Sequence, residues 1–237
     1  MISFTIDIDW APEEVIEDTL SLFEKYKVKC TIFSTHYSKV LEVSDKNLFE
    51  IGIHPNFNTI LSGGARTIDN ILDELLFIHP NARGIRSHSM LQSTMFLQKF
   101  AERKLLYDAN HFLPYQTGIK PFKLWTGMVR IPYNWEDDIH WMYGYSFDSC
   151  KLDIEDKGLN VINFHPVHIF LNSESSERYT KAKPYYNYAD KLIKFRNTET
   201  MGTRDLFISL LEKVSSNGVT SKKLLDVANE YIAGEKG

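Results

Sequence analysis

Two carboxylates stand at the end of an otherwise apolar segment near the amino terminus. The segment FTIDIDW, residues 4–10, alternates apolar and polar side chains and ends on Asp7, Asp9 and Trp10. A buried charge without a partner costs several kcal/mol, so acids in such a place usually bind a metal ion, meet a basic side chain or face a cleft. The sequence therefore predicts that other parts of the chain supply a partner for these acids.

Polar residues also follow four other apolar runs of the chain. With the first, the stretches of this kind are DIDW at 7–10, GIHPNFN at 52–58, RSHS at 86–89, PYNWEDD at 132–138 and NFHPVH at 163–168. A single histidine after a strand is usually a hydrogen-bonded structural residue, and paired aspartates are often helix caps. Several such stretches in one chain favour a shared site, provided that the runs before them are strands of one sheet.

The order of apolar and amphipathic segments predicts such a sheet. Strands are expected at 2–8, 28–33, 47–53 and 83–87, and helices between them at 12–26, 67–78 and 96–104. This alternation is typical of βα units and a mainly parallel sheet or barrel, whose catalytic groups gather at the carboxyl ends of the strands. Two more helices, at 203–216 and 221–234, are expected to be structural.

We expect one domain over residues 1–237. The chain is 43% hydrophobic, enough for one substantial core, and no composition shift marks a boundary. The segment 172–202 is polar and rich in tyrosine, and it is too long for a plain connector. It is either a substrate-covering loop or a simple surface excursion.

Charge and cysteine content exclude several classes of protein. A formal net charge of -4 gives no basic footprint for nucleic acid, and no apolar run is long enough to span a membrane. Cys30 and Cys150 lie far apart, which suggests neither a disulfide framework nor a cysteine-based zinc site. We expect a cytoplasmic protein.

The five polar stretches resemble the strand-end motifs of the NodB-type polysaccharide deacetylases, carbohydrate esterase family four in the broad sense. That family's motifs run TFDD, H-S/T-x-x-H, R-x-P-Y, an Asp/Trp motif and L-x-L-H. In detail, TIDIDW, GIHPNFN, RSHS, WEDD and NFHPVH are most similar to the divergent WbmS-like branch found among surface-polysaccharide genes. The resemblance spans residues 4–168 and implies an α/β fold, a deformed (β/α) barrel of about seven strands. It also implies metal-dependent removal of an acetyl group from an N-acetylated sugar.

The resemblance assigns the catalytic roles residue by residue. Asp7 matches the base that takes a proton from the attacking water, and Arg86 matches the arginine that pairs with that base. His165 matches the final histidine, which protonates the departing amine. Either Asp137 or Asp138 would hold the imidazolium of His165. We expect Asp138 to be a catalytic residue and Asp137 to bind the substrate.

The resemblance also implies one divalent metal ion, with zinc as the first candidate. Asp9 matches the metal-binding aspartate, displaced by one residue, and His54 matches the first histidine of the second motif. The second histidine is replaced by Asn58, expected one turn after His54 on a helix begun by Pro55. An amide oxygen is a weaker zinc ligand than imidazole. The third protein ligand is therefore either Asn58 or His88, which stands where the third motif has its proline.

The remaining candidates are expected to contact the substrate. Trp10, Tyr133 and Trp135 would stack on a sugar ring, unless they belong to the core or rim. Ser89 takes the place of the third motif's tyrosine, whose backbone N–H lies in the oxyanion hole, and His168 is counted with the substrate-binding residues.

The sequence therefore predicts a deacetylase that acts on an N-acetylated sugar or glycan in lipopolysaccharide O-antigen or capsule biosynthesis. One alternative is a metal-dependent amidohydrolase acting on a non-sugar amide, and another is an inactive glycan-binding relative. Asp7, Arg86 and His165 together favour the enzyme, because a pure binder needs no base, paired arginine and acid. The sugar, the native metal and the oligomeric state stay open.

Overall fold

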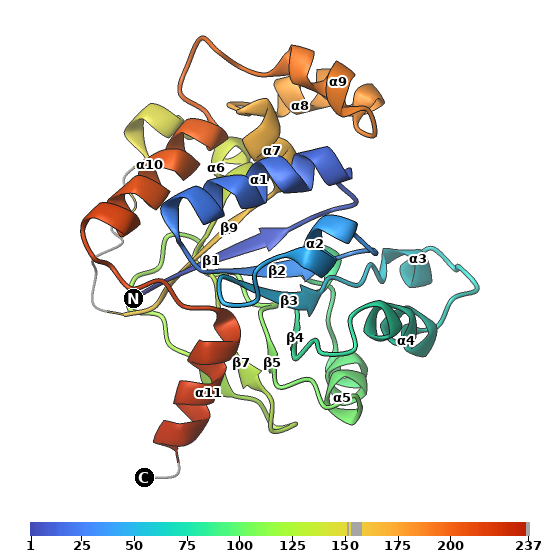
Figure 1. The fold of residues 1–237 in the computed structure, drawn as a ribbon. Helices are drawn as coiled ribbons and strands as arrows, with labels where there is room; N and C mark the ends of the chain where they lie inside the picture. Colours follow the sequence, from blue (N-terminus) through green and yellow to red (C-terminus); the bar gives the residue numbers. More distant parts are fainter. Residues whose placement is uncertain (151, 153–157, 236–237) are drawn as a thin grey trace.

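A curled sheet forms the centre of the computed structural model, which describes residues 1–150, 152 and 158–235 (Figure 1). Its strands lie in the order β6-β7-β5-β4-β3-β2-β1-β9-β8. Their bounds are β1 Ile2–Asp7, β2 Cys30–Ser34, β3 Phe49–Ile53, β4 Gly84–Ile85, β5 Tyr107–Asp108, β6 Phe122–Lys123, β7 Val129–Arg130, β8 Trp135–Glu136 and β9 Asn160–Phe164. Neighbouring strands are parallel except for the antiparallel pair of β6 and β7.

The α/β deformed barrel is confirmed, but the expected strand number was wrong. The described residues form a 9-stranded sheet rather than one of about seven strands. Each of β5 to β8 has only two paired residues, too few to give a hydrophobic run that the sequence would reveal.

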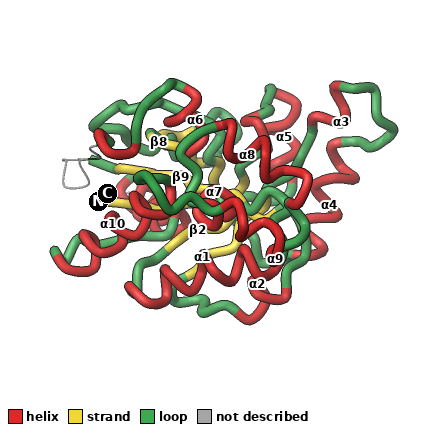
Figure 2. The backbone as a smooth tube through the Cα atoms, turned by 90° about the horizontal axis from the view of Figure 1, so that it is seen from above, coloured by secondary structure: helices red, strands yellow, loops and turns green. Residues whose placement is uncertain are grey.

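Helices connect and cover the strands. Their bounds are α1 Glu13–Tyr26, α2 Lys39–Val43, α3 Asn58–Leu61, α4 Ile68–Ile78, α5 Thr94–Glu102, α6 Asp137–Met142, α7 Pro166–Leu171, α8 Ser176–Ala182, α9 Ala189–Leu192, α10 Thr203–Ser216 and α11 Leu224–Gly234, with short 3-10 turns η1 His88–Met90, η2 Phe147–Ser149, η3 Lys183–Tyr185 and η4 Ile193–Phe195. Seen from above, the strands run through the middle of the molecule between helices (Figure 2). None of the described helices is long and apolar enough to cross a membrane.

The main core lies between the sheet and the layer formed by α1, α7 and α10. Phe4 on β1 meets Phe23 on α1 and Phe207 on α10, with ring centroids 5.8 Å and 6.4 Å away. The apolar stripe of α1 builds this contact, and the helix ends at Lys27, which adopts the left-handed conformation with φ 54°. The helices predicted at the start and end of the chain are therefore confirmed.

A second apolar cluster supports the other half of the sheet. Phe57 packs against Phe96 and Phe100 of α5, with ring centroids 4.7 Å and 6.1 Å away. This cluster fixes the turn after β3 relative to α5. It therefore fixes part of the edge of the sheet at which the parallel strands end. The register, with Asp7 beside Phe33 and Ile53 beside Ile85, brings the polar stretches to that edge.

Candidate active site

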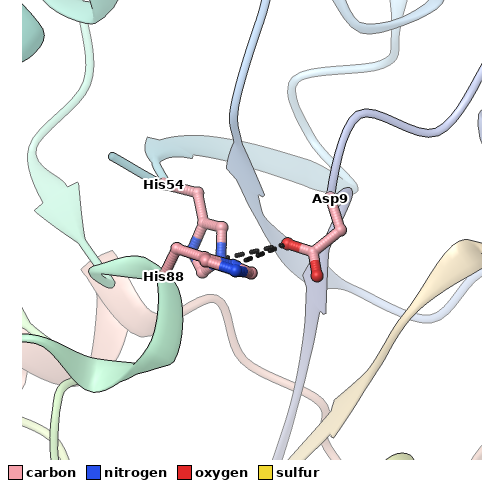
Figure 3. Close-up of side chains that lie close together, drawn as sticks. All are labelled: Asp9, His54 and His88. Atoms are coloured by element: carbon pink, nitrogen blue, oxygen red, sulfur yellow. Dashed lines mark hydrogen bonds and ion pairs between the residues drawn. The ribbon is translucent and has the colours of Figure 1, made fainter. Parts of the chain in front are cut away.

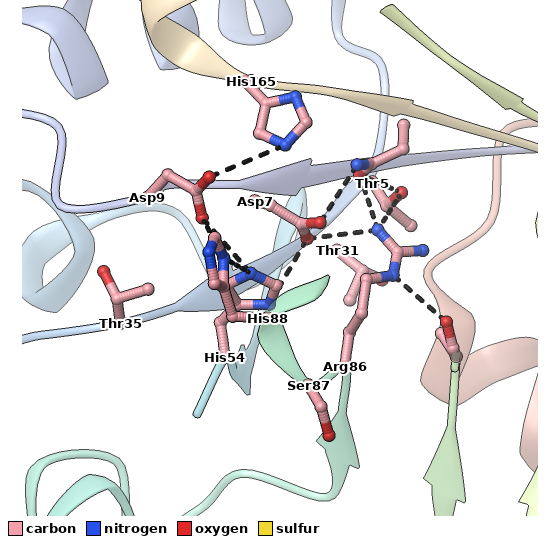
Figure 4. A network of polar contacts seen from close by, with 12 residues as sticks. Thr5, Asp7, Asp9, Thr31, Thr35, His54, Arg86, Ser87, His88 and His165 are labelled. Carbon is pink, nitrogen blue, oxygen red and sulfur yellow. Dashed lines mark hydrogen bonds and ion pairs between the residues drawn. The ribbon is translucent and has the colours of Figure 1, made fainter. Parts of the chain in front are cut away.

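Asp7 and Arg86 form a buried ion pair at the carboxyl end of the sheet (Figure 4). Asp7 ends β1 and Arg86 follows β4, and their side chains are 4% and 1% exposed. The Nη1 of Arg86 donates to Asp7 Oδ1 at 3.1 Å and to Thr5 Oγ1 at 3.0 Å. The guanidinium lies between the rings of Phe33 and Tyr133, 4.6 Å and 4.3 Å from their centroids. The pair compensates two buried charges and fixes the direction of the Asp7 carboxylate.

Asn163, near the end of β9, links the ion pair to a second carboxyl group. Its Nδ2 donates to Asp7 Oδ2 at 3.0 Å and to Glu136 Oε1 at 2.8 Å. Its Oδ1 accepts from Arg86 Nη1 at 2.5 Å, and because arginine can only donate, the orientation of the amide follows. The sequence reasoning missed Asn163 and Glu136, although both stand within the polar stretches.

Glu136 is a buried carboxyl group that is an unusually weak acid. Burial and the nearby negative charge of Asp138 raise the pKa of Glu136 to about 8. The site therefore holds a carboxyl group that keeps its proton near neutral pH next to the paired Asp7.

Asp9, His54 and His88 converge on one another (Figure 3), next to the ion pair, with His54 Nδ1 3.9 Å from Asp7 Oδ1 (Figure 4). Asp9 Oδ1 lies 3.2 Å from His54 Nε2 and 3.3 Å from His88 Nδ1. Burial opposes ionisation of Asp9, but its contacts with His54 and His88 outweigh burial and hold the pKa well below its usual range. Asp9 Oδ1 is buried and accepts no hydrogen bond within the described part of the chain. One carboxylate oxygen and two imidazole nitrogens fit a divalent ion such as zinc.

Asn58 lies differently from the expectation. The helix α3 begins at Asn58 itself, so the expected helix starting at Pro55 was wrong, and Asn58 does not sit one helical turn after His54. The Asn58 Nδ2 donates to Ser89 Oγ at 3.2 Å. Of the two residues considered for the third ligand, His88 is the one that the structure places beside Asp9.

His165 lies at the start of α7 and is held by Asp137. Its Nδ1 is 2.7 Å from Asp137 Oδ1, and its backbone N–H donates to Asp137 Oδ2 at 2.9 Å. Its Nε2 faces the site, 3.9 Å from Asp9 Oδ2 and 4.0 Å from Glu136 Oε1. Burial lowers the pKa of His165, but the charge and hydrogen bond of Asp137, together with the charges of Asp138 and Asp9, outweigh burial and raise the pKa well above the usual value. The site therefore contains an imidazolium ready to donate a proton at neutral pH.

Asp138 and His168 stand behind His165. The carboxylate of Asp138 and the imidazole of His168 bring ligand atoms within 4.8 Å of each other and of His165. His168 is 5% exposed, and burial lowers the pKa of His168 below its usual value. The backbone N–H of Asp138 donates to Asp137 Oδ1 at 2.9 Å, so the two acids are in direct contact.

The aromatic candidates divide by exposure. Trp10 is 43% exposed, and its ring lies edge-on to His88 with centroids 5.3 Å apart. Tyr133 and Trp135 are each 1% exposed, and their burial argues against the predicted stacking on a sugar. Tyr133 instead packs on Arg86. Ser89 is exposed at the same edge, and its φ of 56° places it in a left-handed turn.

The chain is similar in sequence and fold to known polysaccharide deacetylases. The sequence profile of the WbmS-like polysaccharide deacetylases matches residues 4–183. The crystal structure of WbmS from Bordetella bronchiseptica, described as a polysaccharide deacetylase involved in O-antigen biosynthesis, is 42% identical, with a TM-score of 0.83 and 90% of each chain covered. No curated protein matches this chain.

More distant structures share the fold. A polysaccharide deacetylase from Mycobacterium smegmatis is 14% identical, with a TM-score of 0.59 over 99% of this chain and 90% of the other. The peptidoglycan deacetylase PdaC from Bacillus subtilis is 10% identical, with a TM-score of 0.51 over 100% of this chain and 94% of the other. The chain belongs to the WbmS-like polysaccharide deacetylases, hydrolases of the NodB-type superfamily that its strand-end residues resemble.

Proposed function

We propose that the protein is a metal-dependent deacetylase that removes an N-acetyl group from a sugar during the assembly of a surface polysaccharide such as O-antigen. The observation that carries the proposal is the convergence of three groups at one sheet edge. These are the pair Asp7–Arg86, the group of Asp9, His54 and His88, and the imidazole of His165. The 42% identity to WbmS supports the polysaccharide context.

The metal would be held by Asp9, His54 and His88. A divalent ion bound there supplies Lewis acidity, which polarises the acetyl carbonyl and makes the attacking water more acidic. Among the described residues, the buried Asp9 Oδ1 faces two imidazole nitrogens yet accepts no hydrogen bond, and this arrangement favours a cation.

Asp7 and His165 divide the proton transfers of amide hydrolysis. The oxygen of water forms a bond to the acetyl carbon while Asp7 accepts the proton of that water. The carbon–nitrogen bond then breaks as His165 Nε2 gives its proton to the departing nitrogen, so that acetate and a free amino sugar result. Arg86 and Asn163 keep Asp7 directed into the site, and Asp137 keeps His165 charged.

Two residues at the rim would contact the sugar. Trp10 offers an exposed aromatic face beside His88, which suits the apolar side of a pyranose ring. The backbone N–H of Ser89 is the candidate donor to the developing oxyanion. We also propose that the protein acts in the cytoplasm on a nucleotide-linked, lipid-linked or free glycan.

Metal analysis and acetate release together test the proposal. Protein purified without added metal is analysed for metal content, stripped with a chelator and reloaded with zinc, cobalt, nickel or manganese. Acetate release is then measured with free N-acetylglucosamine oligosaccharides and with a nucleotide-linked N-acetylhexosamine. We expect about one ion per chain and acetate release that the chelator abolishes and metal restores.

Other outcomes would contradict specific parts of the proposal. A chain that takes up none of the four metals would remove the metal role. A loaded chain that binds these sugars without releasing acetate would favour the inactive glycan-binding alternative. Release from simple non-sugar amides alone would favour the amidohydrolase alternative.

A further inference from the structure

The two ends of the segment from Asn172 to Gly202 meet at one place. The backbone N–H of Asn197 donates to Leu171 O at 2.8 Å, and that of Thr203 donates to Ser173 O at 3.0 Å. A Cβ added to Gly202 would lie 2.2 Å from the carbonyl oxygen of Asn172, so only glycine fits at this junction. The two ends of the segment are therefore fixed against each other.

The middle of this segment packs against the body of the molecule. In Figure 1 it is the orange part with α8 and α9, beyond α7. Ala182 and Leu192 are 0% and 1% exposed and belong to the main core. The ring of Tyr179 meets that of His168 edge-on, with centroids 4.9 Å apart. The segment is thus anchored both at its ends and along its inner face.

Tyr186 connects this segment to the candidate metal ligand Asp9. Its hydroxyl donates to the backbone oxygen of Asp9 at 2.6 Å. The contact joins residues 177 positions apart in the sequence.

The backbone that Tyr186 holds is strained. Asp9 and Trp10 have φ values of 41° and 59°, a left-handed conformation that aspartate tolerates but that costs about 1–2 kcal/mol for a residue such as tryptophan. Such a turn persists only when its surroundings impose it. The Ala11 N–H closes the turn by donating to Ile8 O at 2.7 Å. Two side chains hold it further: Thr35 Oγ1 accepts from the Trp10 N–H at 3.0 Å, and the Tyr186 hydroxyl donates to Asp9 O.

We propose that Tyr186 is a positioning residue that holds the turn at Asp9 and so directs the Asp9 carboxylate between His54 and His88. The inference rests on the metal role of Asp9 in the proposed function. It makes the segment 172–202 a fixed part of the metal site. Outer partners that orient a metal ligand typically contribute a factor of about 10–100 to metal affinity.

Zinc titration of the metal-free protein against a chromophoric chelator tests this inference. The variants are Tyr186→Phe, which removes only the hydroxyl, and Tyr188→Phe, which removes a hydroxyl from an exposed ring of the same segment. We expect the zinc Kd of Tyr186→Phe to rise about tenfold and that of Tyr188→Phe to stay at the wild-type value. The visible spectrum of the cobalt-loaded protein should shift in Tyr186→Phe, because the carboxylate reaches the ion at a different angle. A role in stability alone would not move that spectrum.

Each other result has a definite meaning. Equal zinc affinity of Tyr186→Phe and wild type overturns the inference and leaves the proposed function intact, whereas a wild type that binds no metal refutes the metal role itself. Equal weakening in both tyrosine variants would show a general effect of the segment and also overturn it. If Tyr186→Phe does not fold, Thr35→Val removes the other anchor of the same turn, and unchanged zinc affinity there counts against the inference.

Discussion

The imidazole of His165 is bound by Asp137 and not by Asp138. Both oxygens of Asp137 are engaged, one with the ring Nδ1 at 2.7 Å and the other with the backbone N–H of His165 at 2.9 Å. Asp137 is 0% exposed, so its charge acts on the ring with little solvent screening. The Nε2 is left to face the site, as a proton donor to a departing amine requires.

The first prediction concerns the pH dependence of this pair. Asp137 raises the pKa of His165 against the effect of burial, so wild-type activity should persist above neutrality and fall only when the imidazolium loses its proton. Asp137→Asn removes the charge that favours the imidazolium, and the alkaline limb of the kcat profile should therefore move to lower pH. Asp138→Asn is the matched control and should move the limb less. A larger shift in Asp138→Asn would reverse the assignment.

A second prediction separates the base and the acid from the metal group. Asp7→Asn and His165→Ala should each reduce acetate release about a hundredfold or more, because each removes one proton transfer. Both variants keep Asp9, His54 and His88, so elemental analysis should still find the ion. If either variant turns over at the wild-type rate, that residue has no part in the mechanism.

The third prediction decides between His88 and Asn58 as the remaining protein ligand. His88 lies 3.3 Å from Asp9 Oδ1, whereas the amide nitrogen of Asn58 donates to Ser89. We expect His88→Ala to weaken zinc binding at least about tenfold and Asn58→Ala to change it less than about twofold. The pair is measured by the same zinc titration, and the opposite order would restore Asn58 as the ligand.

Short sequence patterns predicted those candidate site residues that follow a long apolar run or stand in a recognisable motif. The apolar run at 2–8 predicted β1 and placed Asp7 and Asp9 at its end, and the order of the motifs indicated Arg86 and His165. Each of these signals is contained in a few consecutive residues. Parallel pairing of the strands then brings their ends together at one edge.

The parts that the sequence did not predict depend on contacts between distant residues. Asn163 meets Asp7 across 156 positions, and Tyr186 meets Asp9 across 177, so no local spacing could reveal either contact. The sequence left open whether Trp135 lies in the core or stacks on a sugar, because its strand β8 has only two paired residues and resembles a loop in sequence. The expected helix at Pro55 failed because the apolar cluster around Phe57 holds that turn in an irregular form before α3 begins.

The last prediction concerns Glu136 and the stability of the fold. The folded-state pKa of about 8 lies above the ordinary value of 4.5, so between these values the folded chain keeps a proton that the unfolded chain loses. This group's contribution to the free energy of unfolding therefore falls as pH rises from about 4.5 to about 8, and stays low above that.

The variant Glu136→Gln tests this effect, because its side chain cannot ionise but can still accept a hydrogen bond from Asn163. Relative to wild type, its free energy of unfolding should gain at least about 1 kcal/mol between pH 5 and pH 9 in urea titrations. Glu14→Gln, at an exposed position of α1, is the control and should follow wild type at both pH values. Parallel pH profiles for Glu136→Gln and wild type would mean that Glu136 is ionised in the folded protein at neutral pH.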